Sequence, residues 1–313
     1  MATADGELDE RARGERRGKL ALVFVQLFFG LFPVFGKLAM VGFAPMSVAA
    51  WRVLVGASAL ALVATLAHGR AMLVPLRDLV RLQVCAWLGV VLNMVLFLEG
   101  LQRSTAVNAG LLVATIPVFT FVIAILVRQE RFDLRRGAGI LLAFAGVALL
   151  FAQRGPEFTH DTLVGNSMMA LNALCYSIFL VLSRPLLGRH PPLVVIAWVF
   201  LLSTWAVPFF LRDADLLPGG VEGAAWASLG YVLVFPTVLS YLLNTYALSK
   251  VSASTTAVFI FLQPIIAATG GVLILGERLL PITLVSAATI LAGVWLVARR
   301  RAPARVASPG ISR

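Results

Sequence analysis

The sequence predicts an all-α membrane protein with ten transmembrane helices, arranged as two inverted five-helix repeats. Three observations support this fold class. Of the 313 residues, 60% are hydrophobic and 13% are charged, and the mean hydropathy is +0.92; a soluble domain is about 45–50% apolar and about 25% charged. The apolar residues form long runs, and the second half of the chain repeats the first at a constant offset.

The apolar runs define the predicted spans. A helix of about 20 apolar residues crosses the hydrocarbon of a bilayer. The runs are continuous rather than alternating, and lipid requires every backbone group to be paired within its own segment, which favours helices over strands. The ten runs cover roughly residues 19–39, 46–67, 79–101, 104–127, 135–152, 163–182, 191–211, 224–248, 252–275 and 280–299.

The second half of the chain matches the first at an offset of 147 residues. Pro117 corresponds to Pro264, and Glu130-Arg131 corresponds to Glu277-Arg278. The same offset pairs Lys37 with Arg184, Pro45 with Pro192 and Trp51 with Trp198. Agreement of rare residue types at one offset indicates an internal duplication. Because five crossings are an odd number, the second unit must enter the membrane from the opposite face, as in transporters with inverted repeats.

The charged residues set the domain limits and the orientation. Residues 1–18 mix charges of both signs and predict a disordered cytoplasmic tail; residues 19–152 and 163–299 form the two repeats, and residues 300–313 form a basic cytoplasmic tail. With both termini inside, 20 of the 26 Lys and Arg residues lie at cytoplasmic ends and five lie at outer ends. This bias satisfies the positive-inside rule and predicts a multi-pass protein of a bacterial-type inner membrane. The net charge of +11 therefore orients the chain and does not indicate nucleic-acid binding.

Two runs of residues carry a family pattern. The first is Gly30, Lys37, Pro45 and Arg52, and the second is Ala106, Pro117, Glu130-Arg131, Gly137 and Gly146. The second half of the chain repeats the second run as Ala253, Pro264, Glu277-Arg278 and Gly293, whereas Val199 stands where the first half has Arg52. Together with the duplication, this order resembles the drug/metabolite transporter superfamily, specifically the ten-helix EamA-type proteins. The resemblance implies two EamA repeats, a central substrate cavity and transport, usually export, of small metabolites by alternating access.

Three ionisable residues fall within or near the predicted hydrocarbon. Arg52, Glu99 and Lys37 all lie in the outer part of the membrane, where burial of charge is costly and marks a candidate functional site. We expect Arg52 to contact Glu99, with Lys37 nearby, as a gate or a substrate contact. The alternative is a structural ion pair, or snorkelling of the long side chains to the interface. The resemblance places an uncharged residue at Glu99, so proton coupling through this carboxylate is a further hypothesis.

Two prolines near the middle of predicted spans mark helix breaks. Pro117 and Pro264 cannot donate a backbone hydrogen bond, which frees the carbonyl groups of Val113 and Ile260. In transporters such broken backbone is tolerated where it lines a cavity. The alternative is a plain kink without a binding role.

Uncharged polar residues at membrane depth should face the bundle, because an amide in lipid would lack partners. Gln263, beside Pro264, is the first candidate for substrate contact, followed by Asn93 and Asn244, with Arg52 and Glu99 completing the candidate set. The alternative is hydrogen bonding between helices. The same argument applies to Gln26, Asn108 and Asn172.

Small residues and loop acids complete the pattern. The Ala106-xxx-Gly110 spacing predicts close packing of the fourth and ninth spans, and Gly146 and Gly293 predict the same for the fifth and tenth. The two Glu-Arg pairs lie at loop edges on opposite faces of the membrane. They fit helix capping or interfacial ion pairs, or alternatively the latch of a gate.

These patterns together predict a secondary transporter that exports a small metabolite, such as an amino acid or xenobiotic, by alternating access between the repeats. The alternatives are an anion or nucleotide-sugar antiporter of the same superfamily, a membrane-embedded enzyme and a non-transporting sensor. An enzyme would need several convergent titratable groups at membrane depth, where the sequence offers one Glu and one or two cations. The absence of a GxxxxGK[ST] motif argues against ATP hydrolysis as the energy source, and no metal or cofactor is expected. The expected partners are a small-molecule substrate, the lipid bilayer, and protons or another coupling ion, with no nucleic acid. Substrate, direction, coupling ion and oligomeric state stay open.

Overall fold

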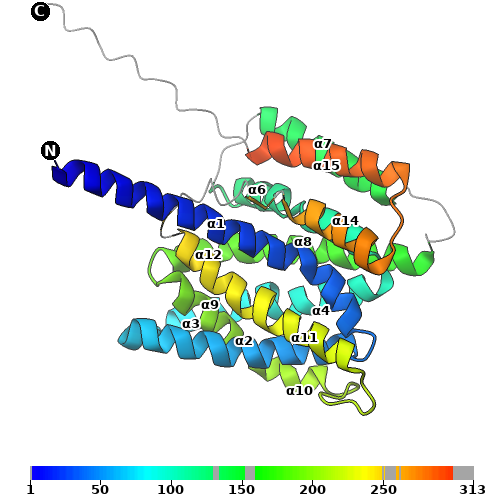
Figure 1. Ribbon diagram of the computed structural model, residues 1–313, viewed down its shortest axis with the longest axis horizontal. Helices are drawn as coiled ribbons and strands as arrows, with labels where there is room; N and C mark the ends of the chain where they lie inside the picture. Colours follow the sequence, from blue (N-terminus) through cyan, green and yellow to red (C-terminus); the bar gives the residue numbers. More distant parts are fainter. Residues whose placement is uncertain are drawn as a thin grey trace, which may run out of the picture.

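The protein is a bundle of roughly parallel helices (Figure 1). A computed structural model describes residues 2–129, 134–151, 159–248, 250, 259–260 and 262–298, and all regular secondary structure within them is helical. The elements are α1 (Ala2–Ala39), α2 (Pro45–His68), η1 (Gly69–Met72), α3 (Leu76–Ala86), η2 (Trp87–Val91), α4 (Leu92–Arg103), α5 (Ala106–Val113), α6 (Ile116–Leu126), α7 (Leu134–Phe151), α8 (His160–Leu187), α9 (Pro192–Leu201), η3 (Thr204–Ala206), α10 (Val207–Phe210), α11 (Gly223–Val234), η4 (Phe235–Leu239), α12 (Ser240–Leu248), α14 (Leu262–Leu275) and α15 (Pro281–Ala298).

Seven helical stretches in the described part of the chain are long and apolar enough to cross a membrane. They are Arg13–Ala39, Pro45–Met72, Leu76–Gln102, Ala106–Leu126, His160–Leu187, Pro192–Phe210 and Gly223–Ala247. Three shorter apolar helices are Gly137–Leu150, Leu262–Leu275 and Pro281–Leu296. The all-helical membrane class is therefore confirmed, whereas the count of ten spans stays a prediction.

The N-terminal segment differs from the disordered tail that the sequence predicts for residues 1–18. Helix α1 continues back to Ala2, and its first part extends beyond the rest of the bundle (Figure 1). Ala, Glu and Arg in this segment are strong helix formers. The Nζ of Lys19 lies 2.7 Å from Glu15 Oε1, an i,i+4 pair that supports the helix. Local propensity and continuity with an apolar span thus outweigh the mixed charge.

Helix ends follow local sequence signals. Helix α2 starts on Pro45 and ends before Gly69, which adopts a positive φ of 47°. Before α5, the Thr105 hydroxyl accepts a hydrogen bond from the Asn108 backbone N–H at 3.0 Å. Such N-caps satisfy a backbone donor that the first turn leaves without a partner.

The halves break their helices at matched places. Pro117 lies in the first turn of α6, and the chain between α5 and α6 turns at Ala114 and Thr115. Pro264 likewise lies in the first turn of α14. Short π-helical segments, η2 and η4, interrupt the third span of the first half and the third span of the second half. Breaks of this kind occur where a protein places side chains or backbone groups for function.

The first helix of each half packs against matched helices of the other half. Helix α1 packs against α11, α12 and α14, and α8 packs against the corresponding α3, α4 and α6. Helix α2 packs on its counterpart α9, and α5 packs on α14. Figure 1 shows α7 and α15 side by side along one edge of the bundle.

Glycines allow the closest of these approaches. A Cβ on Gly293 would lie 2.4 Å from the Ala143 backbone nitrogen, and a Cβ on Gly146 would lie 2.7 Å from the Ile290 backbone nitrogen. Between α5 and α14, a Cβ on Gly110 would lie 2.6 Å from the Ala267 Cβ. The small residues therefore bring together both helix pairs that their spacing predicts.

Candidate functional site

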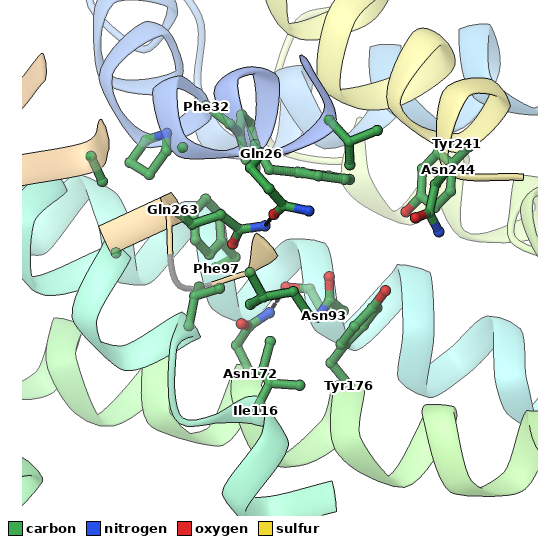
Figure 2. Close-up of a pocket in the computed structure, with 18 of the residues that line it drawn as sticks. Gln26, Phe32, Asn93, Phe97, Ile116, Asn172, Tyr176, Tyr241, Asn244 and Gln263 are labelled. Atoms are coloured by element: carbon green, nitrogen blue, oxygen red, sulfur yellow. Dashed lines mark hydrogen bonds between the residues drawn. The ribbon is translucent and has the colours of Figure 1, made fainter. Parts of the chain in front are cut away.

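A central cavity of about 280 Å³ lies between α1, α2, α4, α5, α6, α8, α12 and α14. Its wall is largely apolar and aromatic, including Phe29, Phe32 and Phe97. Amide side chains interrupt this wall from several helices, namely Gln26, Asn93, Asn172, Asn244 and Gln263 (Figure 2). A mainly apolar, concave site with a few convergent polar groups is typical of small-molecule binding.

The structure brings together four of the five predicted substrate-contact residues. Gln263, Asn93, Asn244 and Arg52 all line the cavity. Asn244 lies on α12, beside Tyr241, on the side of the cavity away from Gln263 (Figure 2). The fifth residue, Glu99, lies outside the described lining.

Two hydrogen bonds tie the cavity amides across helices. Gln263 Nε2 donates to Gln26 Oε1 at 2.6 Å, which links α14 to α1. Asn172 Nδ2 donates to the Asn93 backbone carbonyl at 2.7 Å, which links α8 to α4 (Figure 2). These bonds satisfy part of each amide, and among the described residues they leave the Gln263 side-chain oxygen and the Asn93 side chain available to a solute.

Arg52 is a buried cation in the cavity wall, with a relative exposure of 5%. Its Nε donates to the Thr237 hydroxyl at 3.0 Å. Its guanidinium carbon lies 4.3 Å from the centre of the Phe32 ring, which stacks in turn on Phe97 at 4.9 Å. A guanidinium over an aromatic face gains cation–π stabilisation.

The expected contact between Arg52 and Glu99 is not formed. Glu99 instead pairs with Arg103, one turn further along α4. On a helix, Asn93 and Phe97 are four residues apart and share the cavity face, whereas Glu99 follows Phe97 by about 200° and points away. The preference for the nearer, same-helix arginine leaves Arg52 without this carboxylate.

Lys37 also has a different partner from the one expected. Its Nζ lies 3.6 Å from Glu277 Oε1, which is only 9% exposed. The Glu277 carboxylate also accepts the backbone N–H groups of Ala106 at 2.7 Å and Val107 at 3.0 Å. Glu277 therefore caps α5 and joins it to α1 and to the loop before α15, at what we call the Lys37 end of the bundle.

The chain around Glu277 is shaped for this cap. Gly276 has a positive φ of 68°, a conformation that favours glycine, and it turns the chain back after α14. The Glu277 N–H donates to the Gly271 carbonyl at 3.0 Å. A Cβ on Gly271 would lie 2.7 Å from Glu277 Oε2, so only glycine leaves the carboxylate its place. The counterpart, Glu130, lies outside the described residues.

The opposite end of the bundle has its own polar tie. Asp78, 2% exposed, accepts from Arg189 Nη1 at 2.8 Å and lies 2.9 Å from His190 Nε2. Trp198 Nε1 donates to the Met72 carbonyl at 2.9 Å, and at the Lys37 end Trp51 Nε1 donates to the Leu216 carbonyl at 2.9 Å. The matched tryptophans fasten α9 and α2 to the segments beside them at both ends.

The helix breaks lie at the wall of the cavity. Val113 and Ile260, whose carbonyl groups the prolines were expected to free, both line it. Pro117 has no N–H to offer the Val113 carbonyl. The Ile260 carbonyl accepts from the Gln263 N–H at 3.0 Å, which closes a turn at the start of α14.

Sequence reasoning missed Tyr176, Tyr241 and Thr237. Both tyrosines line the cavity, and Thr237 positions Arg52. A signal for Tyr176 was present, because the offset of 147 pairs it with Phe29, another cavity residue. Thr237 carried no comparable signal, since its role depends on the π-helical segment η4.

Comparison with known proteins gives the same assignment over nearly all of the chain. The model of the EamA-like transporter family matches twice, over residues 16–152 and 163–299. An uncharacterized transporter of Archaeoglobus fulgidus is 28% identical over 222 residues, which cover 70% of this chain and 76% of that protein. A probable terminal-alkyne amino-acid exporter of Streptantibioticus cattleyicolor is 29% identical over 231 residues, covering 72% of this chain and 74% of that protein.

The fold is also known from experiment. A crystal structure aligns with a TM-score of 0.63 at 18% identity, covering 89% of this chain and 95% of that one. At this identity the match concerns the fold alone. The two family matches, together with the relatives that are named transporters, identify the protein as a multi-pass membrane transporter of small molecules and not an enzyme. The chain belongs to the EamA-like transporter family.

Proposed function

We propose that the protein exports a small metabolite, such as an amino acid or a xenobiotic of similar size, through the central cavity. The observation that carries this proposal is that both halves line one cavity at matched positions. Phe97 and Ile116 of the first half correspond, 147 residues on, to Asn244 and Gln263, and all four are lining residues. The probable amino-acid exporter among the relatives supports this choice of cargo.

The mechanism we propose is alternating access between two inverted five-helix repeats, with ten spans in all. The exchange of helix contacts between the halves supports this symmetry. The Glu277 cap on α5, joined by Lys37, closes the Lys37 end, and its release opens the cavity on that side. The excess of Lys and Arg at the predicted cytoplasmic ends supports a bacterial-type inner membrane with both termini in the cytoplasm, and this orientation puts the Lys37 end outside.

The cavity favours this cargo over a nucleotide sugar or another polyanion. Such a solute carries two or more negative charges, which several basic side chains would have to match. Within the described lining, Arg52 is the one charged residue. The remaining wall suits a compact solute with an apolar part.

The test is counterflow into proteoliposomes that contain the purified protein, with a panel of labelled amino acids and aromatic metabolites, with and without a pH gradient. We expect saturable accumulation of at least one solute, driven by unlabelled solute on the other side. The proposal is wrong if protein-containing and empty liposomes behave alike for the whole panel. Stimulation by the pH gradient would identify protons as the coupling ion.

A further inference from the structure

Among the described residues, the side chain of Arg52 has one hydrogen-bond partner, at its Nε, and none at its terminal nitrogens. Within the described residues, Nε donates to Thr237, and the two Nη groups make no hydrogen bond or ion pair. The side chain lines the cavity although the residue is 5% exposed. Four N–H donors are thus available where a bound solute would lie.

No described carboxylate lies against the charge of Arg52 as a counterion. Among the described residues of the cavity wall there is no Asp or Glu. Two carboxylates predicted to lie in the same outer part of the membrane as Arg52 have other partners. Glu99 pairs with Arg103, and Glu277 pairs with Lys37. An arginine keeps its proton in proteins, and an uncompensated buried charge is unfavourable, so an anion in the cavity would be strongly favoured.

The guanidinium is held in a fixed plane. Thr237 donates its own hydroxyl proton to the Val232 carbonyl at 2.7 Å, five residues earlier, which turns an oxygen lone pair toward Arg52 Nε. This i,i+5 contact belongs to the π-helical segment η4. Phe32, stacked on Phe97, supports the guanidinium from one face. A planar, oriented guanidinium matches a carboxylate with two parallel hydrogen bonds.

The position is specific to the first half of the chain. The counterpart of Arg52 is Val199, which is fully buried and outside the described cavity lining. One cation in an otherwise uncharged wall fits one negative group. A solute with a net positive charge would meet this cation without a carboxylate to offset it.

We propose that Arg52, oriented by Thr237 and Phe32, is the carboxylate-binding residue of the cavity. The cargo is then a small monocarboxylate, anionic or zwitterionic, with an apolar or aromatic remainder. Cationic amines of the same shape are rejected. This inference rests on the proposed function only in taking the cavity as the site where cargo binds.

The test compares acid and amine probes of matched shape. They are propionate with propylamine, 3-phenylpropionate with 3-phenylpropylamine, and indole-3-acetate with tryptamine. Protection of the purified protein against thermal unfolding in detergent reports binding without any requirement for transport. We expect the acids to raise the Tm of the wild type and the amines to leave it unchanged, with the aromatic acids giving the larger shifts.

Substitutions then assign the effect to Arg52. We expect Arg52→Gln to weaken acid binding at least tenfold. Arg52→Lys should weaken it less, since lysine keeps the positive charge but lacks the planar guanidinium that binds a carboxylate with two hydrogen bonds. Thr237→Val keeps the charge but loses the orienting hydroxyl, and carries the test should Arg52→Gln not fold. Its matched control is Thr289→Val, because the exposed Thr289 hydroxyl only contacts the Val285 carbonyl of its own helix.

The outcomes separate this inference from the transport proposal. Equal protection by amines and acids, no protection by any acid, or wild-type acid binding by Arg52→Gln would overturn the carboxylate site. Acid binding that depends on Arg52, together with no counterflow of any solute, would support the site and refute transport. Counterflow of amines that is unaffected by Arg52→Gln would support transport and refute the carboxylate site.

Discussion

The two halves of the chain contribute to the cavity at matched positions but with different chemistry. Phe97 corresponds to Asn244, and Ile116 corresponds to Gln263; in each pair the first half is apolar and the second is an amide. The one charged lining residue in the described wall, Arg52, belongs to the first half. Duplication therefore supplied the positions, and later substitution made the two walls unlike.

The contacts between the halves keep the same chemistry at matched positions. Gly146 and Gly293 each bring α7 and α15 into backbone contact, and Trp51 and Trp198 make equivalent hydrogen bonds at opposite ends. Helix packing constrains both copies equally, whereas a solute that lacks twofold symmetry does not. The difference teaches that symmetry is retained where the halves support each other and lost where they face the cargo.

The largest effect is expected when one half's cavity residue is copied into the other. Asn244→Phe gives α12 the phenylalanine that α4 carries at the matched position, Phe97. The substitution removes an amide and fills part of a cavity of about 280 Å³. Counterflow should fall at least tenfold, while the Tm should stay close to that of the wild type, because an aromatic ring is well tolerated next to Tyr241 in a largely apolar wall.

The control is Leu141→Phe, at a side chain that is 74% exposed on α7. It adds the same ring on the lipid-facing surface and should leave counterflow unchanged. Wild-type counterflow by Asn244→Phe would mean that the cargo does not pass through this cavity.

A change in the symmetric contacts should affect stability instead. Gly293→Ala places a Cβ within 2.4 Å of the Ala143 backbone, and the helices must separate, at a cost of about 1–3 kcal/mol. Thermal unfolding in detergent measures this loss. The matched control is Gly230→Ala on α11, where a Cβ meets nothing within 4 Å and helix propensity improves by about 1 kcal/mol. Equal Tm values for the two variants would contradict the assigned packing.

The fold was largely predictable, and the site was predictable in part. Continuous apolar runs and the repeat indicate a helical membrane bundle, because lipid leaves the backbone few alternatives. Gln263 and Asn93 could be placed in the cavity since amides avoid lipid. The pairing of Glu99 with Arg103 could not be predicted from the depth of Glu99 in the membrane, because depth does not say which way a side chain points around the helix axis. Glu99 is rotated by about 200° from Phe97, which lies on the cavity face. The cap of Glu277 on α5 depends on a loop turned by Gly276, which sequence spacing does not reveal.

A smaller effect is expected at the Lys37 end. Glu277→Gln retains shape but loses the charge that caps α5 and pairs with Lys37, which should weaken closure by about 1 kcal/mol, or about fivefold. The rate at which a membrane-impermeant maleimide labels a cysteine at position 244 from the outside should rise by that factor. Arg278→Gln, which changes the adjacent residue, is the control. An unchanged labelling rate in Glu277→Gln would mean that the Glu277 cap on α5 has no part in gating.

The smallest effect is expected at Glu99. Its partner Arg103 is half-buried on the same helix, and such pairs contribute about 0.2–1 kcal/mol. Since Glu99 lies outside the described cavity wall, Glu99→Gln should change neither counterflow nor its pH dependence. A loss of pH dependence in this variant would support the hypothesis that protons are coupled through Glu99. It would also show that ion coupling is not confined to the cavity.

The most direct test of alternating access is two-sided labelling of one cavity position. Asn244→Cys is made in a background with Cys85 and Cys175, both buried, replaced by alanine, after counterflow of that background is verified. Right-side-out and inside-out vesicles are treated with a membrane-impermeant maleimide. The account predicts labelling from both sides and slower labelling when a transported solute is present. Labelling from one side only, under every condition, would contradict a cavity that opens alternately to the two faces of the membrane.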